Sequence, residues 1–314
     1  MEKKRKVKKS VKRSSNILFV IILILLVIFY IYKTSTLKDN KKDPVKDPET
    51  KEELKSEEVK EETSKEKVNN FKKISNYRKE NLNRYEAYKE KNPDLSDETI
   101  VTYVNIGLDY EFYGLIKDTD MSKGILIIVN KYNKLPGEYE ADDLEEISSE
   151  YFVNGNTLVR KLRKEAKEAF EKMSKASIEN GTPVYGQSAY RPYSMQKKIY
   201  DQEVENGGVE YADRDTARPG HSEHQTGLAI DVASEKWGNM YNFANTSSYE
   251  WMENNAHKYG FILRYRNGYE SIHGYIYEGW HYRYVGVKVA TEIHNHIPEI
   301  TYEEYYDKYI NKID

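Results

Sequence analysis

Two short strings in the last third of the chain carry residues that together suit a metal-dependent hydrolase. His224 is followed seven residues later by Asp231, and Glu278 stands three residues before His281. A catalytic zinc ion is typically held by two neutral imidazole nitrogens and one carboxylate oxygen, and its fourth position stays open for water. With two histidines and an aspartate as ligands, Glu278 is left free to act as a base. These four residues are therefore the candidate catalytic and metal-binding residues of the protein.

The spacing also restricts the backbone that carries these residues. His224 and Asp231 cannot share one face of a helix, because Gly227 lies between them and the interval suits a loop that enters a strand. In an extended segment Glu278 and His281 would point in roughly opposite directions, so Glu278 must approach the metal from a turn. By spacing alone, such pairs are more often surface or hydrogen-bonding pairs, and that interpretation stays open at this point.

Hydrophobic patterning predicts the elements that must position the candidate residues. Residues 228–232 are typical of a strand that carries Asp231, and residues 280–285 of a strand that carries His281. Two further strands are expected at residues 125–129 and 183–189. The expected helices run from Asn156 or Thr157 to Asn180, from a cap at Ser194 to about residue 204, from Ser247 or Ser248 to Gly260, and over residues 287–296.

These elements follow one another without regular alternation, which favours an α+β fold over a doubly wound sheet. We expect a single compact domain with a small mixed or antiparallel sheet flanked by helices. Before it, one helix is predicted to end near Asn92 and Pro93, and Ser96 is a possible cap for a second helix.

The first residues favour attachment to a membrane. Residues 3–13 hold eight lysines and arginines, and residues 17–32 carry no charge. This apolar run is slightly short for a spanning helix, but Lys33 can reach the interface with its long side chain. The positive flank predicts a cytoplasmic N-terminus with the bulk of the chain outside. A cleaved signal peptide is the rival interpretation, although no small-residue cleavage site follows the apolar run.

The stretch after the apolar run is rich in Lys, Glu, Asp, Ser and Thr and nearly free of apolar residues, so it is expected to be a solvated tether. An exposed charged helix over residues 52–67 is the alternative, and it would also be a spacer. The chain then divides into a cytoplasmic basic segment at 1–16, a transmembrane anchor at 17–33, a flexible linker at 34–70, a helical leader at 71–123, a catalytic domain at 124–300 and a helical tail at 301–314.

The overall composition excludes several classes of function. The chain has no cysteine, which excludes disulfides, a cysteine nucleophile and thiolate metal sites. The formal net charge is -3, and the one dense basic run lies beside the apolar segment, so no nucleic-acid partner is predicted. Any metal ion must be held by His, Asp or Glu. The sequence indicates no oligomeric state.

Four separated blocks of the chain resemble a known family in order and content. They are Ser-Ala-Tyr-Arg-Pro at residues 188–192, Gln196, Pro-Gly-His-Ser-Glu-His-Gln-Thr-Gly-Leu-Ala-Ile-Asp at 219–231, and Glu-Gly-Trp-His-Tyr-Arg-Tyr-Val-Gly at 278–286. These blocks resemble the VanY-type D-alanyl-D-alanine carboxypeptidases, which are zinc peptidases that trim peptidoglycan stem peptides. The resemblance covers about residues 124–286. It implies that His224, Asp231 and His281 bind zinc and that Glu278 is the general base.

The resemblance also implies roles for the residues around the metal. Arg191 would stabilise the developing oxyanion or bind the carboxylate of the substrate, which suits its planar guanidinium group. Tyr190, Gln196 and Ser222 would contact the substrate. One departure is Gly279, where relatives often carry proline, and it removes no functional group.

The expected function is a membrane-anchored, extracytoplasmic zinc carboxypeptidase that removes the terminal D-alanine of stem peptides by attack of a zinc-bound water. An L,D-carboxypeptidase that trims tetrapeptides is one alternative, and a dipeptidase-like enzyme is a variant of it. A zinc-stabilised wall-binding module without activity is another, and the retained Glu278 argues against it. Among the remaining candidates, His221 is expected at the rim of the pocket, residues 213–215 in a solvated loop, and no second metal site at His294 and His296.

Overall fold

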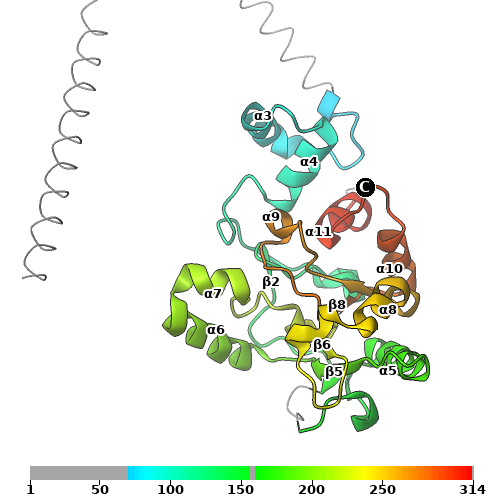
Figure 1. Cartoon of the computed structure of the whole chain (residues 1–314). Helices are drawn as coiled ribbons and strands as arrows, with labels where there is room; N and C mark the ends of the chain where they lie inside the picture. The colour runs from blue at the N-terminus through cyan, green and yellow to red at the C-terminus, as the bar shows by residue number, and fades with distance from the viewer. Residues whose placement is uncertain (1–69, 156–159, 313–314) are drawn as a thin grey trace, which may run out of the picture. The chain divides into compact units, whose positions relative to one another are not determined.

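The computed structural model describes residues 70–155 and 160–312, and a four-stranded sheet organises this part of the chain (Figure 1). All of its strand pairs are antiparallel, and its order is β5 (Tyr185–Ser188), β6 (Ala229–Ala233), β8 (His281–Tyr284) and β7 (Phe261–Leu263). This confirms the α+β class and the predicted strands that carry the candidate residues. β7 was not predicted, because three residues are too few for a pattern.

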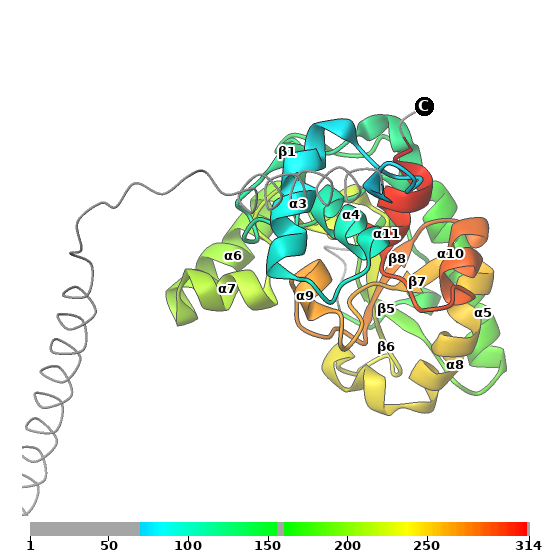
Figure 2. The same ribbon diagram turned by 90° about the horizontal axis from the view of Figure 1, so that it is seen from above.

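Helices lie to either side of this sheet in both views (Figures 1 and 2). On one side are α5 (Lys164–Glu179), α8 (Ser247–Asn255), the 3-10 helix η6 (Ala256–Tyr259) and α10 (Val287–His294). On the other side, α6 (Tyr193–Gly207) and α7 (Val209–Asp215) pack against each other. The helix predicted to end at Gly260 therefore exists as α8 continued by η6.

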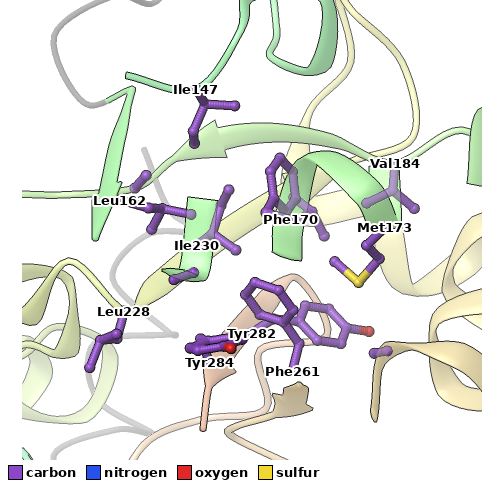
Figure 3. Packing of buried hydrophobic residues seen from close by; sticks show 14 of the residues in the cluster. Ile147, Leu162, Phe170, Met173, Val184, Leu228, Ile230, Phe261, Tyr282 and Tyr284 are labelled. Atoms are coloured by element: carbon purple, nitrogen blue, oxygen red, sulfur yellow. The ribbon is translucent and has the colours of Figure 1, made fainter. Parts of the chain in front are cut away.

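The two faces of the sheet have different chemistry. One face packs against α5, where Phe170 and Met173 lie against Ile230, Phe261 and Tyr282, all of them buried (Figure 3). Burying such large side chains stabilises the fold by about 1.5–3 kcal/mol each. Because side chains alternate along a strand, the neighbours of Ile230 and Tyr282 point to the opposite face, and they include the candidate residues Asp231 and His281.

The leader folds as predicted. α3 (Leu82–Lys91) ends before Asn92. α4 (Asp97–Ile106) begins after Ser96, whose hydroxyl accepts a hydrogen bond from the backbone N–H of Thr99. These helices form their own apolar cluster around Tyr85 and Ile100.

The leader is held to the C-terminal segment by a buried carboxylate. α11 (Tyr302–Tyr305) is followed by a π-helical turn, Tyr306–Ile310, which carries Asp307. Arg78 donates to Asp307 at 2.5 Å, Asn76 donates to it at 2.6 Å and Asn105 at 3.1 Å. The first and last parts of the described chain therefore meet at one side chain.

Replacing Asp307 with alanine is expected to destabilise the protein by about 3 kcal/mol, because Arg78 would lose its buried partner. The control is Asp109→Ala, since Asp109 pairs with Arg84 at 2.6 Å but both residues belong to the leader. Thermal unfolding should fall further for D307A than for D109A. Equal shifts for the two variants would contradict a special role for the contact with the C-terminal segment.

Residues 125–129 do not form the predicted strand. A 3-10 helix, η2 (Met121–Leu126), covers the first part, and residues 127–129 have no regular structure. The guanidinium group of Arg283 donates to the carbonyls of Ile125 and Ile127 at 3.0 and 2.8 Å. A side chain thus satisfies backbone groups that a strand ladder would otherwise pair.

The helix expected from Asn156 or Thr157 begins later, at Lys164, and residues 156–159 lie outside the described residues. Leu162 belongs instead to a short strand, β4 (Lys161–Arg163), paired with β3 (Leu144–Glu146). Leu162 lies at helical spacing from the apolar residues of α5, so the sequence pattern placed it in the same helix. The backbone of Arg163 is extended, with ψ of 144°, so the helix starts after it.

Two smaller predictions are wrong. Ser194 is not a cap, because α6 begins at Tyr193 and Pro192 occupies the capping position, where its missing N–H costs nothing. Residues 213–215 are not a loop, because they end α7, where Asp213 pairs with Arg218 at 2.7 Å. The remaining elements are short: β1 (Lys117–Asp118), β2 (Asn133–Lys134) and α9 (Glu270–His273).

The predicted segments at 1–16, 17–33 and most of 34–70 lie outside the described residues, so they remain predictions. Among residues 70–155 and 160–312, no helix has the length and apolar character needed to cross a membrane.

Candidate metal centre and active site

The structure brings His224, Asp231 and His281 together at the polar face of the sheet. One side-chain donor atom from each lies within 4.8 Å of the others, and all three residues are buried. Asp231 and His281 are direct partners across β6 and β8. His224 lies in a 3-10 turn, η4 (Glu223–Thr226), and Gly227 follows it with φ of 70°, so the chain bends into β6 as the spacing predicted.

In each imidazole one ring nitrogen faces Asp231, and the other, outer nitrogen has an acceptor of its own that orients the ring. Nδ1 of His224 lies 2.7 Å from the carbonyl oxygen of Ala189, which can only accept, so Nδ1 carries the proton. This leaves the lone pair of Nε2 facing Asp231 at 3.3 Å. In His281, Nε2 lies 3.5 Å from the carboxylate of Glu223, while Nδ1 lies 3.0 Å from Asp231.

This donor set fits a divalent cation with two nitrogen ligands and one oxygen ligand. Burial and two acceptors on the outer nitrogens are typical of metal-binding histidines. The electrostatics agree: burial alone would lower the pKa of His281, but hydrogen bonds to Asp231 and Glu223 raise it to about 9. Burial alone would raise the pKa of Asp231, but the two histidines hold it well below its usual range. The carboxylates of Asp231 and Glu223 thus favour a positive charge at this centre.

Glu278 approaches this centre from a turn, as predicted. The backbone N–H of His281 donates to the carbonyl of Glu278 at 3.1 Å, and the N–H of Glu278 donates to the carbonyl of Tyr265 at 3.0 Å. A carboxylate oxygen of Glu278 lies 3.8 Å from Nδ1 of His281. A Cβ at Gly279 would lie 2.6 Å from the hydroxyl of Tyr277 and 2.7 Å from Cβ of Ala244, so a larger residue here would require these neighbours to shift.

Burial raises the pKa of Glu278 to about 7, with His281 and Arg191 opposing the shift and Asp231 adding to it. A carboxyl group with a pKa near neutrality can both accept and return a proton under physiological conditions. Glu278 therefore has the property that a general base needs.

Arg191 lies beside the ligands and is firmly held. Its Nη1 donates to Oε1 of Gln196 at 2.7 Å, and its Nη2 donates to the hydroxyl of Ser188 at 3.2 Å. Its Nη2 also lies 3.9 Å from Asp231. Burial lowers the pKa of Arg191, while the carboxylates of Asp231 and Glu278 oppose this shift. Arginine stays protonated in proteins, so a fixed positive charge faces the centre.

The three predicted substrate contacts are all buried. Gln196 links Arg191 to the carbonyl of Ala217, to which it donates at 2.7 Å, so in this structure it positions the arginine. Ser222 directly precedes η4 and is buried. Burial raises the pKa of Tyr190 to about 12, so its hydroxyl stays neutral. Contact of these three residues with substrate stays a prediction.

The sequence reasoning missed a buried network of four charges behind His281. Glu223 accepts from Arg264 at 2.9 Å and from Arg283 at 3.0 Å, and Arg264 also pairs with Glu303 of α11 at 2.5 Å. Burial would raise the pKa of Glu223, but the two arginines hold it well below its usual range. Glu223 is thus a charged acceptor for Nε2 of His281. Its partners lie 41 and 60 residues away, so no local spacing could reveal them.

Replacing Glu223 with glutamine is expected to weaken zinc binding by about 10–100-fold, because the acceptor that orients His281 loses its charge. The control is Glu303→Gln, which also removes a charged partner of Arg264 but does not touch His281. Both variants should unfold at lower temperature, and a chelator competition should separate them. Equal zinc affinities for E223Q and E303Q would contradict this role.

The other histidines lie away from the ligand set. His221 is buried and its Nδ1 contacts the carbonyl of Asn130 at 2.7 Å. His294 stacks on His257 at 3.7 Å, and His296 contacts the carbonyl of Pro298. Within the described residues, the only group of three or more potential metal ligands is the one at His224.

Comparison with known proteins shows which family the chain resembles. Residues 159–287 match the sequence profile of the family described as VanY, D-alanyl-D-alanine carboxypeptidase. The chain is 40% identical over 209 residues to "Putative carboxypeptidase YodJ" of Bacillus subtilis (strain 168), which covers 64% of this chain and 76% of YodJ. It is 32% identical over 189 residues to a D-alanyl-D-alanine carboxypeptidase of Enterococcus faecalis (strain ATCC 700802 / V583). That match covers 56% of this chain and 64% of the relative.

A solved structure of the LdcB LD-carboxypeptidase, described in terms of peptidoglycan recognition, is also similar. It is 40% identical, with a TM-score of 0.57 over 62% of this chain and 90% of LdcB. The profile match contains every predicted site residue, and the relatives share most of their length with the described domain. The chain belongs to the VanY family of D-alanyl-D-alanine carboxypeptidases.

Proposed function

We propose that the protein is a zinc-dependent carboxypeptidase that releases the terminal D-alanine of peptidoglycan stem peptides. The observation that carries the proposal is one buried centre in which His224, Asp231 and His281 converge beside Glu278, a carboxyl with a pKa of about 7. Membership of the VanY family supports the class of substrate.

The metal ligands, Glu278 and Arg191 have separate roles in the proposed reaction. A zinc ion held by the three ligands would polarise the scissile carbonyl and lower the pKa of water toward about 7. Glu278 accepts the proton of the attacking water and returns it to the leaving amine. Arg191, fixed by Gln196 and Ser188, binds negative charge on the oxyanion or on the carboxylate of the terminal residue.

The bond that is cut separates two candidate activities. We predict D,D-cleavage of pentapeptide stems, which the family description and the E. faecalis relative support. A second candidate is L,D-cleavage of tetrapeptide stems, which is favoured by 40% identity over 90% of the LD-carboxypeptidase LdcB. Both reactions release D-alanine, so the same centre serves either of them.

The deciding experiment offers the full chain synthetic pentapeptide and tetrapeptide stems, each with and without a chelator. Release of D-alanine from the pentapeptide, abolished by chelator and restored by zinc, is the expected result. Release from the tetrapeptide alone would support the second candidate. Binding of both peptides without any release would overturn the proposal and favour a wall-binding module.

The proposed place of action is the outer side of the cell membrane. The support is the sequence of residues 1–33, where a basic segment precedes an uncharged apolar run. Residues 34–70 would then hold the catalytic domain away from the bilayer. Protease treatment of intact cells tests this proposal, because only an external domain would be cleaved while the membrane is closed.

A further inference from the structure

A second cavity lies apart from the metal centre, at the free edge of the sheet. It has a volume of about 600 Å³ and is bordered by α8, η6, β7, α10 and residues 299–302. Tyr277 lines it, but neither Glu278 nor any of the three metal ligands does. Its volume lies within the range of about 300–1,000 Å³ that is usual for small-molecule sites. The cavity is therefore a candidate site of its own.

Two residues that line this cavity each carry a buried polar atom without a partner. In the part of the chain that the structure describes, five buried side-chain atoms have no hydrogen bond, and two of them belong to residues that line this cavity. They are the hydroxyl of Tyr282, a residue only 1% exposed, and Nδ1 of His257. A buried hydroxyl without a partner costs free energy, so a group that enters the cavity and pairs with it would be bound favourably.

The surrounding side chains add neutral hydroxyls and aromatic faces. Tyr249 and Tyr277 line the cavity beside Tyr282, and burial, with Tyr277 and the carboxylate of Glu253 adding to it, raises the pKa of Tyr249. His257 stacks on His294 with their rings 3.7 Å apart and nearly parallel. The lining thus combines flat rings with groups that donate or accept hydrogen bonds.

The charges of the lining favour a neutral ligand over an anionic one. Arg264 is paired with Glu223 at 2.9 Å and with Glu303 at 2.5 Å. Arg266 is paired with Glu299 at 3.0 Å and donates to the carbonyl of Ile300 at 2.8 Å. Both arginines of the lining are therefore occupied by the chain itself, and no lysine lines the cavity.

We propose that this cavity binds a neutral saccharide. Sugar hydroxyls both donate and accept, so they can pair with the hydroxyl of Tyr282, with His257 and with Glu253 at once. The C–H faces of a pyranose ring suit the apolar faces of the tyrosine rings. The inference goes beyond the proposed function, which concerns only the peptide end of the substrate. The choice of an N-acetylglucosamine probe is the one step that rests on it.

The test titrates N,N′,N″-triacetylchitotriose into the full-length protein and follows the heat of binding. Saturable binding to the wild type is expected. Tyr282→Phe should lower the association constant about three- to tenfold, the effect of one neutral hydrogen bond. The variant should stay as stable as the wild type, because the hydroxyl has no partner in the free protein.

A matched control is Tyr77→Phe, which removes another buried, unpartnered hydroxyl that lies outside the cavity. This variant should bind the saccharide like the wild type. A second cavity variant, Glu253→Gln, should weaken binding and guards against a folding defect in Y282F. No saturable binding to the wild type, or equal affinities for Y282F, E253Q and Y77F, would overturn the proposal.

The saccharide site and the proposed function can be refuted independently of each other. Saccharide binding should persist in the Glu278→Ala variant, because Glu278 does not line the cavity. Saccharide binding without peptide release would refute the carboxypeptidase alone. Peptide release without saccharide binding would refute the second site alone.

Discussion

The Glu278→Ala variant is expected to bind zinc like the wild type and to release D-alanine about 10²–10⁴-fold more slowly, the usual loss when a general base is removed. The structure separates the two properties, because Glu278 is not one of the three converging ligands. Its carboxylate nevertheless lies within 3.8 Å of His281 and has a pKa of about 7. Zinc content by mass spectrometry and D-alanine release by a coupled assay measure both properties.

Two further variants make the result specific. Glu278→Gln keeps the shape of the side chain but cannot accept a proton as a carboxylate does, so it should be as slow as E278A. Glu250→Ala removes an exposed glutamate on α8 and should keep the wild-type rate. A zinc-loaded E278A enzyme that works at the wild-type rate would rule out Glu278 as the base.

The Asp231→Asn variant is expected to lose both zinc and activity. Its carboxylate faces His224 at 3.3 Å and His281 at 3.0 Å, and it supplies the only negative charge among the three ligands. Loss of an outer acceptor costs about 10–100-fold in metal affinity, so loss of a direct ligand should cost more than about 100-fold. Competition with a chromogenic chelator measures this change in affinity.

Asp213→Asn is the matched control for this variant. Asp213 is a half-buried carboxylate, and it pairs with Arg218 at 2.7 Å, outside the ligand set. It should keep its zinc even if its thermal stability falls. Wild-type zinc affinity in D231N would show that the three residues are not the metal site.

The sequence predicted the parts of the fold whose information is local. Strands at residues 228–232 and 280–285 followed from the residues of those segments themselves, and the cap at Ser96 followed from the residues after it. The same local logic failed where distant groups decide the backbone. Residues 125–129 have the composition of a strand, but the side chain of Arg283 takes up their carbonyl groups.

In the candidate site, too, some features could be predicted from the sequence and others depend on the fold. Residue types and spacing made His224, Asp231, His281 and Glu278 candidates for a zinc site, and the family resemblance implied their roles as three ligands and a base. The turn at Gly279 was also predictable, since a side chain three residues before a strand ligand must come from a bend. The sequence by itself therefore determined which atoms are available for the chemistry.

Only the tertiary structure decided how those atoms are arranged and charged. The carbonyl of Ala189 and the carboxylate of Glu223 select which nitrogen of each imidazole faces Asp231. Glu223 can do so only because Arg264 and Arg283, far along the chain, keep it ionised inside the protein. Hydrogen bonds and burial depend on neighbours in space, so orientation and pKa follow from the packed fold, whereas residue type and spacing are already present in the sequence.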